Sequence, residues 1–164
     1  MDVPIPDSYR VTEGLLAGEY PGARDPFVAA LRLRAFEAFG ITHFVDLTHT
    51  DDALEPYESV LVPPARRIAY PIVDLGTVTS ARMTCILDEL DEALGAGGSV
   101  YLHCWGGIGR TGIVVGCWLL RHDRDAGDVL ARLAALRANV GDAHRPSPET
   151  DVQRALVEAW IPGR

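Results

Sequence analysis

The fold follows from one stretch, His103-Cys104-Trp105-Gly106-Gly107-Ile108-Gly109-Arg110-Thr111-Gly112. An apolar run, 99–102, precedes it and a longer one, 113–120, follows it, which predicts a strand, a glycine-rich turn and a helix. Such a turn presents backbone N–H groups and the positive end of the helix dipole, and both favour an anion. Because Cys104 stands on this turn, the sequence predicts a thiolate beside a phosphate.

Length and composition indicate an ordinary globular chain. It has 164 residues, of which 48% are hydrophobic and 23% are charged, so we expect a single domain over residues 1–164. The formal net charge of −8 argues against nucleic acid or an acidic membrane surface as a partner.

The remaining bulk features predict a cytoplasmic protein. The apolar runs are too short to span a bilayer, and residues 1–6 have neither the basic nor the apolar part of a signal peptide. Cys85 and Cys117 lie on apolar helix faces with no disulfide or zinc spacing, so we expect both in the core. We expect a monomer.

Apolar periodicity divides the chain into alternating strands and helices. The predicted strands cover residues 15–20, 44–48, 67–72 and 99–103, and the predicted helices cover about 26–39, 80–94, 111–122, 129–136 and 148–160. Val28, Leu31, Ala35 and Phe39 mark the expected buried face of the first helix. Ser147-Pro148 has the N-cap and N1 pattern expected at the start of the last one.

This alternation predicts an α/β fold. We expect a single layered domain with a central, mixed or mostly parallel sheet of about four to five strands, flanked by helices. Ligands of such sheets bind beyond the carboxyl ends of the strands, where Cys104 lies.

The turn has the groups needed for phosphoryl transfer. Its N–H groups, from Trp105, Gly106, Gly107, Ile108 and Gly109, can bind the phosphoryl oxygens, and Arg110 adds a planar, bidentate contact. A helix N-terminus and an arginine also stabilise a thiolate. Thr111 can donate its hydroxyl to the cysteine sulfur, and we expect His103 to order the turn rather than act as a base.

The motif His103-Cys104-x5-Arg110-Thr111 resembles the signature loop of the cysteine-based protein tyrosine and dual-specificity phosphatases. The resemblance extends from about Leu15 to Trp160. In its short length the chain is similar to the compact dual-specificity group, which implies one phosphatase domain over residues 1–164. The resemblance also implies a phosphocysteine formed on Cys104, an aspartic acid that protonates the leaving oxygen, and no metal or organic cofactor.

The same resemblance points to Asp74 as the acid, because Tyr70-Pro71-Ile72-Val73-Asp74 is similar to the P-I-x-D segment of small family members. Asp46, Asp51 and Asp52 are its rivals. We interpret Asp46 as structural because it lies in a strand pattern, and Asp51 and Asp52 as solvated loop charges.

The sequence also leads to expectations for the roles of Gln153 and Trp105. Ser147-Pro148-Glu149-Thr150-x-x-Gln153-Arg154 resembles a segment of small phosphatases, so Gln153 either orients the hydrolytic water or is an exposed residue of a capped helix. Trp105 departs from the smaller residue usual in the family. We expect its ring to pack beneath the loop, with the pocket mouth as the alternative.

These features favour a phosphomonoesterase acting on phosphotyrosine, and also on phosphoserine or phosphothreonine, in proteins. The neutral loop residues weaken the case for a phosphorylated metabolite, inositol phosphate or lipid; Arg66 and Arg67 are expected at a solvated strand end. A non-catalytic phosphoprotein-binding module is disfavoured because Cys104, Arg110 and Asp74 are all present. A rhodanese-like transferase is disfavoured by the spacing of Arg110 from Cys104.

Overall fold

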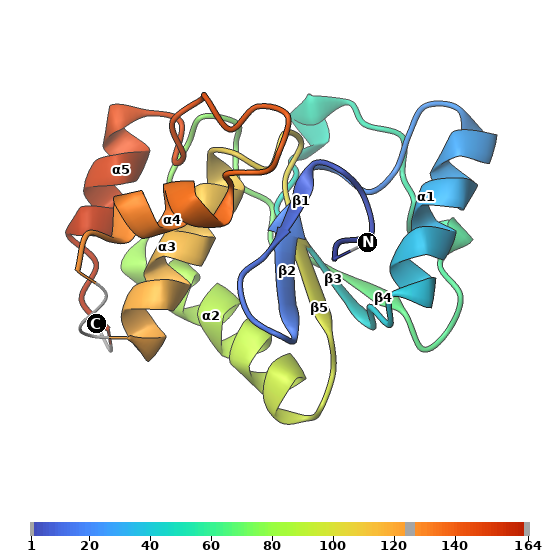
Figure 1. The fold of residues 1–164 in the computed structure, drawn as a ribbon, viewed down its shortest axis with the longest axis horizontal. Helices are drawn as coiled ribbons and strands as arrows, with labels where there is room; N and C mark the ends of the chain where they lie inside the picture. The colour runs from blue at the N-terminus through green and yellow to red at the C-terminus, as the bar shows by residue number, and fades with distance from the viewer. Residues whose placement is uncertain (1, 124–126, 163–164) are drawn as a thin grey trace.

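A five-stranded sheet forms the centre of the protein, in the order β1-β2-β5-β3-β4. A computed structural model describes residues 2–123 and 127–162. The strands are β1 (Ser8–Arg10), β2 (Leu15–Gly18), β3 (His43–Asp46), β4 (Arg66–Ala69) and β5 (Val100–His103). β2, β5, β3 and β4 are parallel, and β1 pairs antiparallel with β2 (Figure 1). The predicted α/β class and mostly parallel sheet are confirmed.

Four of these strands were expected, and each begins within one residue of its predicted start. The edge strand β1 was not expected, because three residues, Ser-Tyr-Arg, are too few to show an alternating pattern. Its pairing with β2 covers an edge of the parallel sheet.

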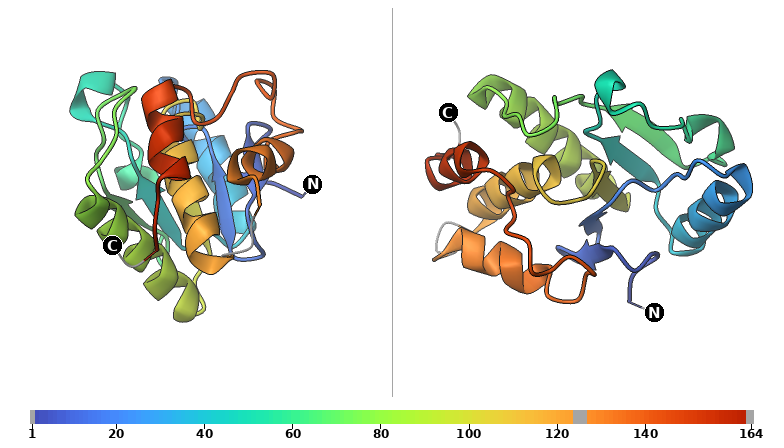
Figure 2. Two further views of the ribbon diagram at one scale, coloured as in Figure 1. Left: turned by 90° about the vertical axis from the view of Figure 1, so that its left-hand side faces the viewer. Right: turned by 90° about the horizontal axis from the view of Figure 1, so that it is seen from above.

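The central strands β2 and β5 are buried along their whole length because helices cover both faces of the sheet. In β5, Val100 and Leu102 enter one hydrophobic cluster, and Tyr101 enters the other. The first face packs against α2 (Ser80–Gly95), α3 (Arg110–His122), α4 (Val129–Leu136) and α5 (Asp151–Glu158). α1 (Pro26–Ala38) covers the opposite face (Figures 1 and 2).

α1 starts as expected, since Asp25 caps it and Pro26 is its first residue. Its predicted face is wrong: Val28 and Leu31 are exposed, whereas Ala29, Leu33 and Phe36 are buried. Apolar residues occur all round this helix, so periodicity alone could not select the face that packs.

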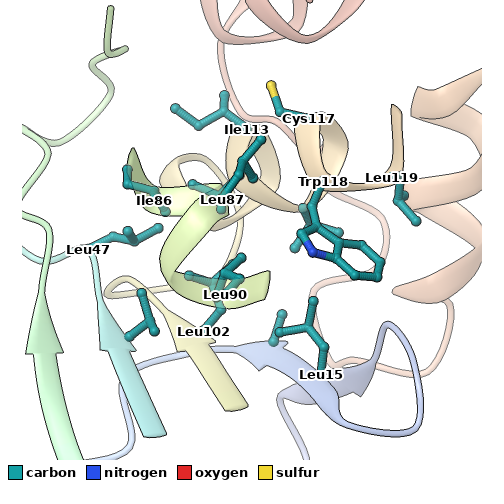
Figure 3. Close-up of a cluster of buried hydrophobic side chains, with 14 of the residues drawn as sticks. Leu15, Leu47, Ile86, Leu87, Leu90, Leu102, Ile113, Cys117, Trp118 and Leu119 are labelled. Carbon is teal, nitrogen blue, oxygen red and sulfur yellow. The ribbon is translucent and has the colours of Figure 1, made fainter. Parts of the chain in front are cut away.

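α2 and α3 form the larger core with the sheet. Thr79 caps α2, since its hydroxyl accepts from Arg82 N. Figure 3 shows side chains of α2 and α3 with Leu15 and Leu102 from the central strands. Cys117 of α3 is buried in this cluster as predicted, but Cys85 of α2 is exposed, contrary to the prediction.

α5 begins later than the sequence predicted. Thr150, not Ser147, is the N-cap, and its side chain accepts from Gln153 N in a capping box. The Ser147-Pro148 bond is cis, and Ser147 lies outside the helix. The hydroxyl of Ser147 instead donates to the carbonyl of Ile108, which ties this segment to the glycine-rich turn.

The parallel strands direct four loops to one edge of the sheet. Beyond β2 lie residues 19–25, beyond β3 the 3₁₀ segment Thr50–Asp52, beyond β4 the turn that holds Asp74, and beyond β5 the turn that holds Cys104. No helix among residues 2–123 and 127–162 has the length and apolar character that a membrane span needs.

Candidate active site

The carbonyl groups of the turn after β5 point away from its centre. Four of them accept hydrogen bonds from outside the loop: Cys104 O from His103 Nδ1, Trp105 O from Tyr20 N, Ile108 O from Ser147 Oγ, and Gly109 O from Ile113 N. Within the described residues, the backbone N–H groups of 105–109 have no acceptor. This separation of carbonyls and N–H groups makes the loop an anion cradle.

Gly107 lets the loop close. Its φ is +70°, and a Cβ there would lie 2.4 Å from the carbonyl carbon of Gly18. Only glycine combines this backbone conformation with so close an approach to β2.

Cys104 lies at the base of a pocket of about 310 Å³ and is 3% exposed. The pocket is lined by Asp74, Cys104, Trp105, Gly106, Ile108, Gly109, Arg110, Arg145 and Glu149. The structure therefore brings Cys104, Arg110 and Asp74 into one pocket, although 30 residues of sequence separate Asp74 from Cys104.

Arg110 is almost completely buried and is held from three sides. Its Nη1 donates to Asp52 Oδ2 at 2.6 Å and to the carbonyl of Ile72 at 3.1 Å. Its Nη2 lies 3.2 Å from Asp74 Oδ1. Nε is buried without a partner among the described residues, so Nε and Nη2 can together receive a phosphate.

Asp52 is not the solvated charge that the sequence predicted. Its side chain is buried against Arg110, whereas Asp51 is exposed as predicted. Nothing in the polar loop around Asp52 distinguishes the two carboxylates, and only the packing of that loop over the pocket selects one of them.

Asp74 occupies the exposed rim of the pocket. Its side chain is 52% exposed and lies beside the guanidinium of Arg110. The carboxylate therefore lines the pocket and is open to a bound ligand.

His103 is buried and neutral. Its Nδ1 lies 3.2 Å from Cys104 O, which can only accept, so Nδ1 carries the proton and Nε2 accepts from the hydroxyl of Tyr57 at 2.7 Å. Burial lowers the pKa of His103 to about 4, against the opposing effect of Asp46. The ring thus fixes the position of the cysteine carbonyl.

Asp46 and Arg67 form a support behind the loop. Asp46 accepts from Thr48 and from Arg67 Nε at 2.7 Å, and its other oxygen lies 3.8 Å from His103 Nδ1. This placement agrees with the structural role predicted for Asp46. Arg67 is paired rather than solvated, whereas Arg66 is exposed as expected.

Thr111 and Gln153 lie behind the pocket-lining residues. The hydroxyl of Thr111 is buried and has no partner among the described residues. Gln153 is buried, not exposed: its Oε1 accepts from the N–H groups of Glu149 and Thr150, and its Nε2 donates to Gly76 O at 3.0 Å. It therefore links the start of α5 to the turn that holds Asp74.

Trp105 does not pack beneath the loop. Its side chain is 54% exposed and lines the pocket mouth, which was the alternative expectation. Arg145 and Glu149, paired at 2.5 Å, also line the pocket and were not foreseen. Only the return of the chain between α4 and α5 brings them to this edge.

Comparison with known proteins agrees with this geometry. The family described as Swiss Army Knife protein, DSP-PTPase phosphatase domain (PTP-SAK), matches residues 25–155. A putative tyrosine phosphatase, 067L, of invertebrate iridescent virus 3 is 34% identical over 116 residues, which are 68% of this chain and 45% of the viral protein. The chain thus spans less than half of that relative's length.

Solved structures share the fold. The active form of Tk-PTP superposes with a TM-score of 0.69 and 20% identity, over 94% of this chain and 99% of that one. The human tyrosine phosphatase-like serine/threonine/tyrosine-interacting protein gives a TM-score of 0.71 at 18% identity, over 94% and 95%. With a family match over residues 25–155 and the signature loop in place, the chain belongs to the cysteine-based protein tyrosine phosphatase superfamily, among its compact dual-specificity-like members.

Proposed function

We propose that this protein hydrolyses phosphomonoesters through a phosphocysteine on Cys104, with phosphotyrosine in proteins as its principal substrate. The proposal depends on the convergence of Cys104, Arg110, Asp74 and the N–H groups of the loop, which have no acceptor among the described residues, on one pocket. The family membership supports the same reaction class.

In the first step, the sulfur of Cys104 attacks phosphorus, and the bond from phosphorus to the ester oxygen breaks. Asp74 gives its proton to the departing oxygen, so that an alcohol or phenol leaves. The loop N–H groups and Arg110 stabilise the charge on the three phosphoryl oxygens.

In the second step, water attacks the phosphocysteine, and Asp74 takes the proton of that water. The sulfur–phosphorus bond breaks, which releases inorganic phosphate and restores the thiolate. Thr111, whose buried hydroxyl makes no hydrogen bond within residues 2–123 and 127–162, is the donor that we assign to the departing sulfur. Gln153 has a second hydrogen on Nε2 beyond its bond to Gly76, with which it orients the water.

The alternative substrate is a phosphorylated metabolite, inositol phosphate or lipid, and Arg145 at the pocket rim is the residue that favours it. A panel of phosphotyrosine and phosphothreonine peptides, inositol phosphates and nucleotides separates the two. We expect the highest kcat/KM with phosphotyrosine peptides, with inhibition by vanadate and none by EDTA.

A non-catalytic phosphoprotein-binding module is the alternative of another class. It predicts binding of phosphopeptides without release of phosphate from any member of the panel. Turnover that Cys104→Ser removes, with the fold preserved, would exclude it.

A further inference from the structure

The loop presents one large side chain to its ligand. Gly106, Gly107 and Gly109 have none, and Ile108 is 3% exposed, which leaves Trp105 as the large exposed side chain of loop positions 105–109. The contrast with the other two tryptophans is sharp, since Trp118 is 7% and Trp160 8% exposed. The indole of Trp105 therefore has little role in the core.

The backbone of Trp105 is nevertheless held in place at the pocket mouth. The carbonyl of Trp105 accepts from Tyr20 N at 2.8 Å, and the residue directly follows the nucleophile Cys104. Trp105 lines both the pocket of Cys104 and a neighbouring pocket of about 250 Å³ that contains Tyr20 and Leu54. Trp105 thus separates the pocket of Cys104 from the neighbouring pocket and lines both.

The turn that holds Asp74 also exposes apolar groups. Val73 and Leu75, on either side of Asp74, are among the exposed large hydrophobic residues of the protein. Apolar surface therefore lies at Trp105 and next to Asp74, two residues that line the pocket in which an ester would place its leaving group.

We propose that Trp105 is the specificity-determining residue of this site, and that its indole packs against the flat aromatic leaving group of aryl phosphates. This inference rests on the proposed function and deepens it, since the contact is made by the leaving group and not by the phosphate. Aromatic pairs gain energy beyond the burial of their area, which an alkyl or polyol leaving group cannot supply.

The test compares kcat/KM for phenyl phosphate and for glycerol 2-phosphate in the unaltered protein and its variants. The ratio between the two esters cancels any general loss of activity. We expect Trp105→Ala to lower kcat/KM about tenfold for phenyl phosphate, mainly through KM, and less than about twofold for glycerol 2-phosphate. Trp105→Phe should recover most of the loss.

Two control variants accompany this comparison. Leu31→Ala removes a side chain of similar exposure, 57%, from α1 and should leave kcat/KM unchanged for both esters. Arg145→Ala tests recognition by charge. Equal losses for both esters in Trp105→Ala, or a change of the ester ratio in Arg145→Ala alone, would overturn the proposal.

A binding measurement separates this inference from the proposed function. In Cys104→Ser, phenyl phosphate should quench tryptophan fluorescence, and inorganic phosphate should not, because Trp105 is the exposed indole. Absence of turnover for both esters in the unaltered protein would refute the proposed hydrolase activity. Absence of quenching by phenyl phosphate bound to Cys104→Ser would refute the proposed role of Trp105.

Discussion

Arg110 and Asp52 form a buried ion pair, with Nη1 and Oδ2 2.6 Å apart. The pair fixes the guanidinium through Nη1, which leaves for the phosphate Nε, unpartnered among the described residues, and Nη2, which faces the exposed Asp74 at 3.2 Å. A buried arginine without its carboxylate would lose both orientation and charge compensation.

Asp52→Ala should therefore lower kcat/KM about tenfold or more with p-nitrophenyl phosphate, because Arg110 no longer has a fixed position. Removing the carboxylate also removes a repulsion toward phosphate, but positioning outweighs it because the pair is buried. Asp51→Ala, which removes the exposed neighbouring carboxylate, is the control. Equal activity of both variants would contradict a positioning role for Asp52.

Asp74→Ala should lower kcat about 100-fold with phenyl phosphate, whose leaving oxygen needs a proton. The loss should be smaller with p-nitrophenyl phosphate, since that leaving group departs without one. The variant should also lack the limb of the pH–activity profile that a general acid produces. If the profile is unchanged in the variant, the acid lies elsewhere.

His103 predicts how stability depends on pH. Burial lowers its pKa from 6.5 to about 4, so between these values the unfolded chain binds a proton that the folded protein does not. The free energy of unfolding should therefore fall as pH decreases from 6.5 to 4, by about 3 kcal/mol from this residue. Urea unfolding at several pH values measures the slope.

His103→Gln should be less stable at pH 7 but should have a flatter slope in this window. The exposed His144 supplies the control, because His144→Gln should retain the slope of the unaltered protein. A slope that survives in His103→Gln would assign the effect to other groups.

Gln153 allows a matched pair of substitutions. Gln153→Glu keeps an acceptor for Thr150 N, so α5 still starts correctly, but it cannot donate to Gly76 O or to water. We expect it to slow hydrolysis of the phosphocysteine about tenfold, so that a burst of p-nitrophenol precedes the steady state. Gln153→Ala should show the burst together with lower stability. A lower kcat without a burst would place the loss in the first step.

The parts predicted from sequence are those governed by local patterns. The strand, glycine turn and helix around Cys104 were identified because apolar runs and glycines are contiguous there. The same holds for the start of α1, which lies at Pro26 as expected.

The residues that sequence reasoning missed or misplaced depend on contacts between distant segments. Asp52 meets Arg110 across 58 positions, and Arg145 reaches the pocket only through the loop between α4 and α5. The exposure of Cys85 follows from how α2 is rotated against the sheet, and that of Trp105 from how the loop lies over the site. The hydrophobic periodicity of the sequence determines neither of these two exposures.

The central claim is that Cys104 carries the phosphoryl group during turnover. Rapid acid quenching with p-nitrophenyl phosphate, followed by mass spectrometry of peptides, tests it most directly. We predict a phosphate on the peptide that contains Cys104 in the unaltered protein, more of it in Gln153→Glu, and neither adduct nor turnover in Cys104→Ser. Turnover in Cys104→Ser, or hydrolysis without a phosphorylated Cys104 peptide even in Gln153→Glu, would contradict the account.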